Sequence, residues 1–162
     1  MLSRVILLVI ASGCAAINLN AAQSPDETSI REILRAQTEA WNRGDGIACA
    51  KEFTHDSDFV NLRGDTLQGR GEIGARVTAS LQGRMKGSRL SVSIRKFTLP
   101  TPDVALVETD YEYSGIQSRL PGVATAEGVL RTRMKYVAVR LDKHCCFIAA
   151  QNTPVLPPSP KR

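Results

Sequence analysis

The first strong pattern of apolar positions lies in residues 24–43 and predicts an amphipathic helix. One face of this helix carries, at helical spacing, Ile30, Ile33, Leu34, Gln37 and Trp41. Ser24 is a suitable N-cap, Pro25 suits the first helical position, and Glu27 completes a capping box. Two further helices are predicted at residues 46–53, which Asp45 can cap, and at residues 72–85.

In the second half of the chain the apolar pattern changes to a period of two, which is typical of strands. Strands are predicted at residues 58–62, 66–68, 90–95, 103–113, 129–141 and 145–150. Pro100 and Pro102 should interrupt the chain, and parity along the strand turns Thr109 and Tyr111 inward. The last strand is apolar on both sides, so we expect it to be central and covered. Helices followed by an antiparallel meander indicate the α+β class, with helices on one face of the sheet.

Length and charge limit the organisation and the partners. A chain of 162 residues fits one domain, which we place at residues 23–153 and follow with a disordered, proline-rich tail at 154–162. The net charge is +5, but the basic residues are dispersed and aromatic residues make up only 5%, which argues against nucleic-acid binding. No P-loop, dinucleotide fingerprint or zinc-ligand spacing is present, so we predict neither a metal site nor a cofactor.

Residues 1–22 have the order of regions found in a secretory signal peptide. Arg4 is followed by an apolar run at residues 5–11 and then by small residues. The apolar run is far shorter than the roughly 20 residues that span a membrane. Two processing routes remain open: cleavage after a small residue such as Ala15, Ala16 or Ala22, or lipidation at Cys14. Either route predicts an exported protein, periplasmic or secreted, with membrane attachment only through Cys14.

Three cysteines remain after removal of the signal peptide. Cys145 and Cys146 are neighbours on one strand and point to opposite faces, so a bond between them would be strained. We favour three small buried hydrophobic residues. The alternative is a disulfide between Cys49 and either Cys145 or Cys146, which an oxidising compartment permits.

The segment FTHDSDFVN, residues 53–61, gathers several candidate chemical groups. His55 and Asp56 would need a third partner to bind a metal, and the only other histidine is His144, in a predicted turn. His55 as a catalytic base is a second possibility. We favour a solvated junction between helix and strand. Because side chains alternate along a strand, Asp58 should lie on one face of the predicted strand, and Phe59 and Asn61 on the other.

Four motifs in this order resemble the nuclear-transport-factor-2-like superfamily, and within it the SnoaL-like group of ketosteroid-isomerase-related bacterial proteins. They are WNRGD at 41–45, F-x-x-D-x-D-F-V-N at 53–61, Gly64 with Gly69-Arg70 before a helix, and FIAAQNTP at 147–154. The resemblance covers residues 26–154. It implies a cone-shaped fold of three N-terminal helices on a curved antiparallel sheet, often a homodimer, which encloses an apolar pocket.

The resemblance also implies a set of residues around that pocket. Carried over onto this chain, the set is Gln37, Trp41, Phe59, Asn61, Tyr111 and Asn152. The position of the steroid-isomerase base falls on Asn61, and that of its tyrosine donor falls on Gln37. The acid donor position falls near Tyr136 and Val137, where no carboxyl group is found. Because an amide cannot accept the proton, steroid-isomerase chemistry is not expected.

Three functional hypotheses follow from these observations. The first is an exported protein that binds a small apolar organic molecule in its pocket. The alternative is a hydratase, isomerase or cyclase acting on a small apolar carbonyl or polyketide-like substrate, with Tyr111, His55 or Asp58 carrying the proton. A second alternative is a dimeric interaction module. Fold alone does not choose among them, so enzymatic activity stays open.

Overall fold

The computed structural model describes residues 26–117, 128–141 and 144–156. The predictions for the signal peptide, for lipidation at Cys14 and for residues 157–162 lie outside these ranges. The described residues form three helices and six strands, and the predicted α+β class is confirmed. No helix in these ranges is both long enough and apolar enough to cross a membrane.

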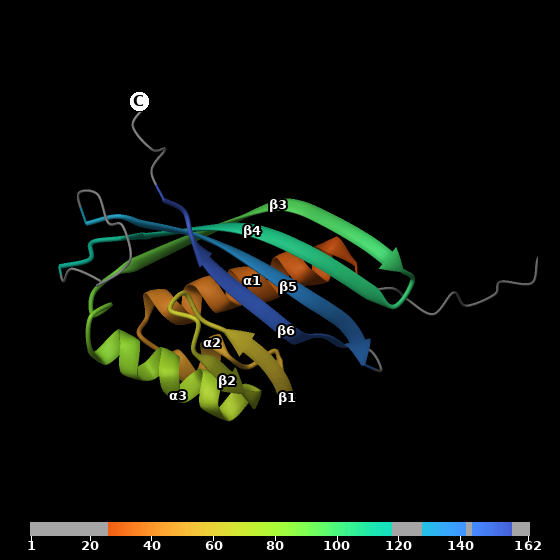
Figure 1. Cartoon of the computed structure of the whole chain (residues 1–162), viewed down its shortest axis with the longest axis horizontal. Helices are drawn as coiled ribbons and strands as arrows, with labels where there is room; N and C mark the ends of the chain where they lie inside the picture. Colours follow the sequence, from red (N-terminus) through yellow and green to blue (C-terminus); the bar gives the residue numbers. More distant parts are fainter. Residues whose placement is uncertain (1–25, 118–127, 142–143, 157–162) are drawn as a thin grey trace, which may run out of the picture.

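All six strands belong to one curved sheet with the order β2-β1-β6-β5-β4-β3 (Figure 1). Their bounds are β1 Phe53–Val60, β2 Thr66–Gln68, β3 Arg89–Thr101, β4 Val104–Ser114, β5 Leu130–Leu141 and β6 His144–Pro154. Neighbours are antiparallel except β1 and β6, which run parallel with Phe59 opposite Ala150. The prediction of a purely antiparallel sheet was therefore wrong. β1 and β6 are separated by a long crossover rather than a hairpin, so no turn forces them to be antiparallel.

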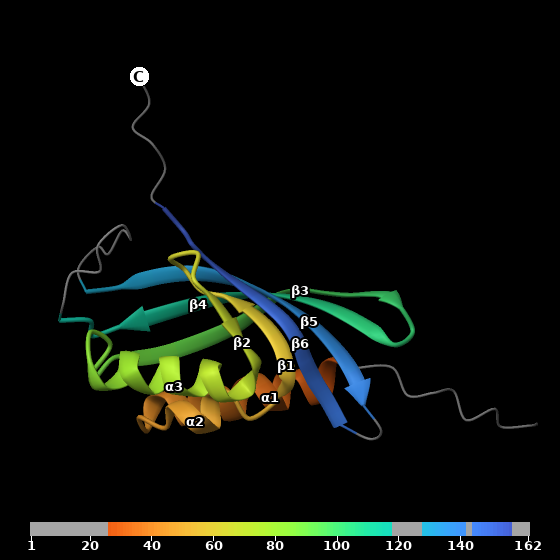
Figure 2. The same cartoon turned by 60° about the horizontal axis from the view of Figure 1, so that its bottom comes forward.

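The helices α1 (Glu27–Asn42), α2 (Gly46–Cys49) and α3 (Gly69–Gln82) lie on one side of the sheet (Figure 2). They do not form one N-terminal block, because β1 and β2 stand between α2 and α3 in the chain. α2 is shorter than expected because β1 already begins at Phe53. A Cβ atom on Gly46 would lie 2.3 Å from the backbone nitrogen of Thr78, so glycine allows α2 to pack directly on α3.

Both ends of α1 are fixed by side chains. Asp26, not Ser24, is the N-cap, and it accepts a hydrogen bond of 2.7 Å from the backbone N–H of Ser29. At the other end, Asn42 accepts from the backbone N–H of Leu90 at 2.7 Å and donates to its carbonyl at 3.0 Å. The Asn42 contacts tie the C-terminal end of α1 to β3.

The strands bury alternate residues as their sequence pattern predicts. Thr109 and Tyr111 of β4 are buried, together with Tyr136 of β5 and Phe147 of β6. β3 continues through Pro100, contrary to expectation, because it is an edge strand whose outer N–H groups need no partner. β6 is central, as predicted, but the helices cover only one of its faces and Ile148 is 38% exposed.

The three cysteines in the described part of the chain are free thiols, so the alternative of a disulfide was wrong. Cys49 lies in α2 below the sheet and is buried, while Cys145 and Cys146 lie on β6, the first buried and the second half-buried. The favoured reading of small buried hydrophobic residues fits Cys49 and Cys145.

Candidate functional site

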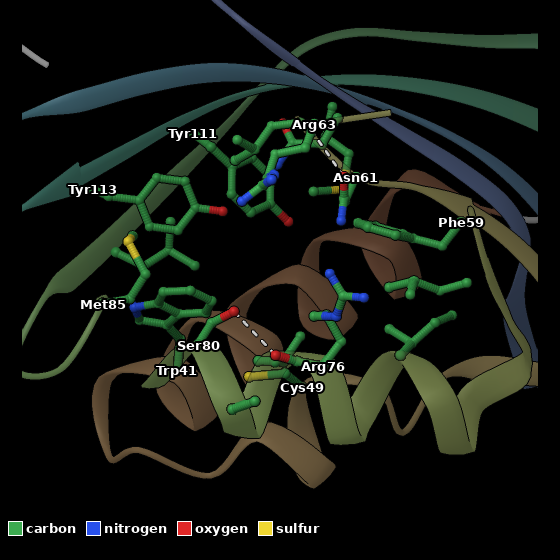
Figure 3. Close-up of a pocket in the computed structure, with 18 of the residues that line it drawn as sticks. Trp41, Cys49, Phe59, Asn61, Arg63, Arg76, Ser80, Met85, Tyr111 and Tyr113 are labelled. Atoms are coloured by element: carbon green, nitrogen blue, oxygen red, sulfur yellow. Dashed lines mark hydrogen bonds between the residues drawn. The ribbon is translucent and has the colours of Figure 1, made fainter. Parts of the chain in front are cut away.

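A cavity of about 420 Å³ opens between the helices and the concave face of the sheet (Figure 3). This volume is in the range of small-molecule pockets. All six residues that the resemblance implied are among those that line it: Gln37, Trp41, Phe59, Asn61, Tyr111 and Asn152. Their contact with a ligand stays a prediction. Much of the remaining wall is apolar and includes Phe53, Leu67, Ile73, Val77, Met85, Leu90, Leu130 and Met134.

Gln37 is the centre of a hydrogen-bonded cluster at one side of the cavity. Its Nε2 donates to the carbonyl of Cys49 at 2.9 Å, and its Oε1 accepts from the hydroxyls of Tyr111 at 3.0 Å and Tyr136 at 3.2 Å. The two hydroxyls also lie within hydrogen-bonding distance of each other, so their two protons are shared among these three contacts. Burial raises the pKa of both tyrosines, so both stay neutral. The cluster satisfies its own donors and acceptors, which explains how a glutamine can face an apolar core.

Trp41 and Tyr113 form a second side of the cavity. Their ring centroids are 4.9 Å apart at an interplanar angle of 57°, and the Trp41 Nε1–H donates to Ser88 Oγ at 3.2 Å. Tyr113 follows the same strand parity as Tyr111, so the alternation in β4 could have identified it. The tryptophan ring is thereby held in place with its polar atom satisfied.

Asn152 on β6 is a buried polar residue of the cavity wall whose side chain interacts with the Tyr113 hydroxyl but whose amide oxygen is not satisfied. It is only 7% exposed, and its Oδ1 has no hydrogen-bond partner within residues 26–117, 128–141 and 144–156. Among the described residues of the cavity wall, only Asn152 has a buried side-chain atom without a hydrogen-bond partner. A buried acceptor without a donor costs about 1–3 kcal/mol, so a donor from a bound molecule would be stabilising here.

The structure places Asn61 differently from the sequence interpretation. β1 ends at Val60, so Asn61 begins the turn rather than extending the strand. Its Oδ1 accepts from the backbone N–H groups of Arg63 at 2.8 Å and Asp65 at 3.1 Å, and its Nδ2 donates to Asp65 Oδ2 at 3.0 Å. The amide lies at the cavity but is fully engaged in its own turn. Asn61 therefore shapes the turn and has little capacity left for a ligand.

Three arginines line the cavity that the sequence interpretation missed. Arg63 comes from the turn after β1, Arg76 from α3, and Arg84 from the segment after α3. Figure 3 shows Arg63 and Arg76 reaching into the cavity from opposite sides. Arg76 lies three residues after the buried Ile73, so helical spacing already placed it beside the inward face. The position of Arg63 carried no such signal.

Cys49 was also missed, and it is a poor nucleophile where it lies. Its Sγ is 3.7 Å from the carbonyl of Gln37, and burial raises the pKa of the thiol to about 12. The thiol therefore stays protonated and serves as apolar lining.

Apart from Asn61, the polar residues of FTHDSDFVN are absent from the cavity lining. The side chains of His55 and Asp56 are 87% and 73% exposed, and Asp58 bonds to Gln68 on the neighbouring strand. His144 is also exposed. Within the described ranges, no three His, Cys, Asp or Glu side chains gather where they could hold a metal ion.

The chemistry that this lining can support follows from its composition. Among the described residues of the cavity wall there is no histidine and no carboxylate. The amides of Gln37 and Asn61 cannot act as general bases, and the buried tyrosines are neutral. The cavity can bind an apolar molecule and hydrogen-bond to it, but it offers no group with the pKa of a base near neutral pH.

No protein-family model and no curated protein sequence matches the chain at a significant level. Solved structures do match. A domain of unknown function with a cystatin-like fold from Nostoc punctiforme is 28% identical, with a TM-score of 0.70 over 82% of this chain and 78% of that one.

Two more distant structures share the fold. One is a nuclear-transport-factor-2-like protein of unknown function from Shewanella oneidensis, 17% identical, with a TM-score of 0.61 over 78% of this chain and 97% of that one. The other has a ketosteroid-isomerase-like fold, comes from Catenulispora acidiphila and was solved in complex with trimethylamine. It is 20% identical, with a TM-score of 0.51 over 75% of this chain and 83% of that one. These structures share the fold that the sequence resemblance to the nuclear-transport-factor-2-like superfamily implied.

Proposed function

We propose that this protein binds a small, mainly apolar organic molecule in the cavity between its helices and its sheet and does not transform it by proton transfer. The observation that carries the proposal is the lining: apolar side chains, amides already engaged in hydrogen bonds, and no general base among the described residues. The unpartnered Oδ1 of Asn152 supplies a polar anchor for a donor on the ligand.

The alternative of a hydratase, isomerase or cyclase has little support from the groups that it would require. Of the three suggested proton carriers, His55 and Asp58 lie outside the cavity. Tyr111 lines it, but its hydroxyl is already bonded to Gln37 and Tyr136. A binding function needs none of these groups to titrate.

The structural neighbour from Catenulispora acidiphila supports a binding function by analogy, since it was solved with trimethylamine. A related fold therefore occurs in a complex with a small organic molecule. At 20% identity the likeness concerns the fold, so the chemistry of the ligand has to come from the residues of this chain.

The chain contains a built-in reporter of the cavity. Trp41 is its only tryptophan, and it lines the cavity beside Tyr113. A bound apolar molecule should shift the emission of Trp41 and raise the melting temperature, because a ligand that binds only the folded state stabilises it. Native mass spectrometry of the protein purified from its own host should show a co-purifying small molecule.

A pair of alanines on α3 provides a matched test. Both alanines are exposed, but Ala79 lines the cavity and Ala75, on the same helix, does not. Ala79→Phe should abolish the Trp41 response to the ligand, and Ala75→Phe should leave it unchanged. Equal loss in both variants, or a native protein with no bound molecule and no response to any apolar probe, would refute a binding function.

We also propose that the protein is a homodimer that associates through the outer face of its sheet. Near the β3–β4 turn this face is apolar: Leu106 lies opposite Val137, Val139 lies opposite Cys146, and Ile148 is exposed. Light scattering should give twice the monomer mass, and Val137→Lys should shift it to the monomer. A monomeric wild-type protein at high concentration would refute this arrangement.

Export remains a proposal that rests on the order of regions in residues 1–22. The intact mass of the mature protein from its own host distinguishes the routes. Cleavage after a small residue leaves an unmodified chain, whereas lipidation at Cys14 adds acyl groups. A full-length mass would refute export.

A further inference from the structure

We infer that the ligand is an organic anion, an apolar body that carries a carboxylate or a similar acidic group, with its head held by Arg63 and Arg76 at the mouth of the cavity. This inference rests on the proposed binding function and names the chemical class of the ligand.

The first support is the sign of the charges around the cavity. Its described lining includes three arginines, Arg63, Arg76 and Arg84, and no aspartate or glutamate. These side chains belong to exposed residues, so they mark the mouth, while the floor is buried and apolar. The potential at the entrance therefore favours an anion, and the floor favours an apolar body.

The second support is the state of the guanidinium groups. Arg76 donates to Asp65 Oδ2 at 2.9 Å, and this carboxylate also accepts from Asn61. The side chains of Arg63 and Arg84 have no hydrogen bond or ion pair within the described residues. Asp65 thus interacts with Arg76 and Arg63, and Arg84 adds a third cation to the lining, which leaves an excess of positive charge at the mouth.

The third support is the geometry of the two arginines that face each other. Arg63 extends from the turn after β1 and Arg76 extends from α3, on opposite sides of the cavity (Figure 3). Asn61 fixes the backbone of Arg63 through its Oδ1, so Asn61 is a positioning residue for this cation. Two guanidinium groups on opposite walls can hold a carboxylate between them through paired N–H donors.

Three probes of equal chain length test the inference: octanoate, 1-octanol and octylamine, which are anionic, neutral and cationic near neutral pH. Binding is followed by Trp41 emission and by calorimetry. Octanoate should bind about tenfold or more tightly than octanol in low salt, and the difference should shrink as salt screens the arginines. Octylamine should bind most weakly.

The variants locate the effect. Arg63→Gln should weaken octanoate about tenfold and leave octanol unchanged, and Arg63→Glu should reverse the preference toward octylamine. Because the Arg63 side chain makes no bond within the described fold, these variants should keep their melting temperature. Arg35→Gln on the solvent face of α1 removes the same charge away from the cavity and should have no effect.

The outcomes separate the two proposals. If octanol binds as tightly as octanoate and Arg63→Gln changes neither, the anion inference is overturned while the binding function stands. If none of the three probes changes Trp41 emission or the melting temperature, both proposals fail. If Arg35→Gln weakens octanoate as much as Arg63→Gln, the effect is one of net charge, and the site at the mouth is refuted.

Discussion

The hydrogen-bonded cluster around Gln37 makes the sharpest prediction about stability. Gln37→Leu keeps the approximate size of the side chain and removes all its polar atoms. The carbonyl of Cys49 then loses its donor at 2.9 Å, and the Tyr111–Tyr136 pair loses the common acceptor of its hydroxyls. Both tyrosines are buried, so water cannot replace that acceptor.

The magnitude follows from the number of groups left without partners. The two hydroxyls can still bond to each other, so one hydroxyl proton remains without an acceptor and one carbonyl without a donor. At about 1–3 kcal/mol for each of these two buried unsatisfied groups, Gln37→Leu should lower the free energy of unfolding by about 2–6 kcal/mol. Adding Tyr111→Phe and Tyr136→Phe removes the orphaned hydroxyls, so the triple variant should recover about half of that loss.

Urea unfolding followed by Trp41 emission and by circular dichroism measures these free energies. Gln82→Leu, at the exposed end of α3, is the matched control and should change stability by less than about 0.5 kcal/mol. A loss below about 0.5 kcal/mol for Gln37→Leu would mean that the cluster is not a stabilising network. A triple variant less stable than Gln37→Leu would show that the hydroxyls do not need Gln37.

Two further predictions concern Asn61 and Cys49. Asn61→Ala removes three hydrogen bonds from an exposed turn and should lower the free energy of unfolding by about 1–2 kcal/mol. Urea unfolding measures this loss, and an unchanged midpoint would contradict the role of Asn61 in the turn. Because burial raises the pKa of the Cys49 thiol to about 12, its neutral form is favoured in the fold. The stabilisation by the neutral thiol is complete below the pKa of the unfolded state and is lost as the pH rises toward 12. Because the folded thiol is buried and protonated, alkylation of Cys49 should be much slower in the folded protein than in urea. Equal rates would refute its burial.

The sequence pattern was sufficient for features that depend on neighbours in the chain. Alternation in residues 103–113 gave the inward direction of Thr109 and Tyr111, and helical spacing placed Gln37 and Trp41 on one face. The parallel pairing of β1 with β6 was not predictable in this way, because nothing local specifies which distant strand completes a sheet. For the same reason the bond between Gln37 and Tyr136, 99 residues apart, could not be read from either segment.

The end of β1 shows how a small local difference changes a functional interpretation. The predicted strand at residues 58–62 ran past the observed end at Val60, and strand parity therefore placed the amide of Asn61 toward a ligand. Because the strand stops at Val60, the same amide instead closes a turn and places Arg63 at the mouth. The charged groups at the cavity mouth are therefore arginines, which no motif in the sequence grouped together.

This arrangement also explains why a single substitution would not produce a steroid-isomerase site here. An aspartate at position 61 would keep its oxygens near the turn N–H groups of Arg63 and Asp65 and would lie beside the Asp65 carboxylate. The donor position is occupied by Gln37, whose Nε2 already donates to the Cys49 carbonyl and whose Oε1 is an acceptor that cannot stabilise an enolate. Both positions are committed to the internal structure, and freeing them would require redesign of the turn and of the buried cluster together. A cavity whose polar groups are engaged in this way is suited to hold an apolar body by burial, which leaves selectivity to the exposed charges at its mouth.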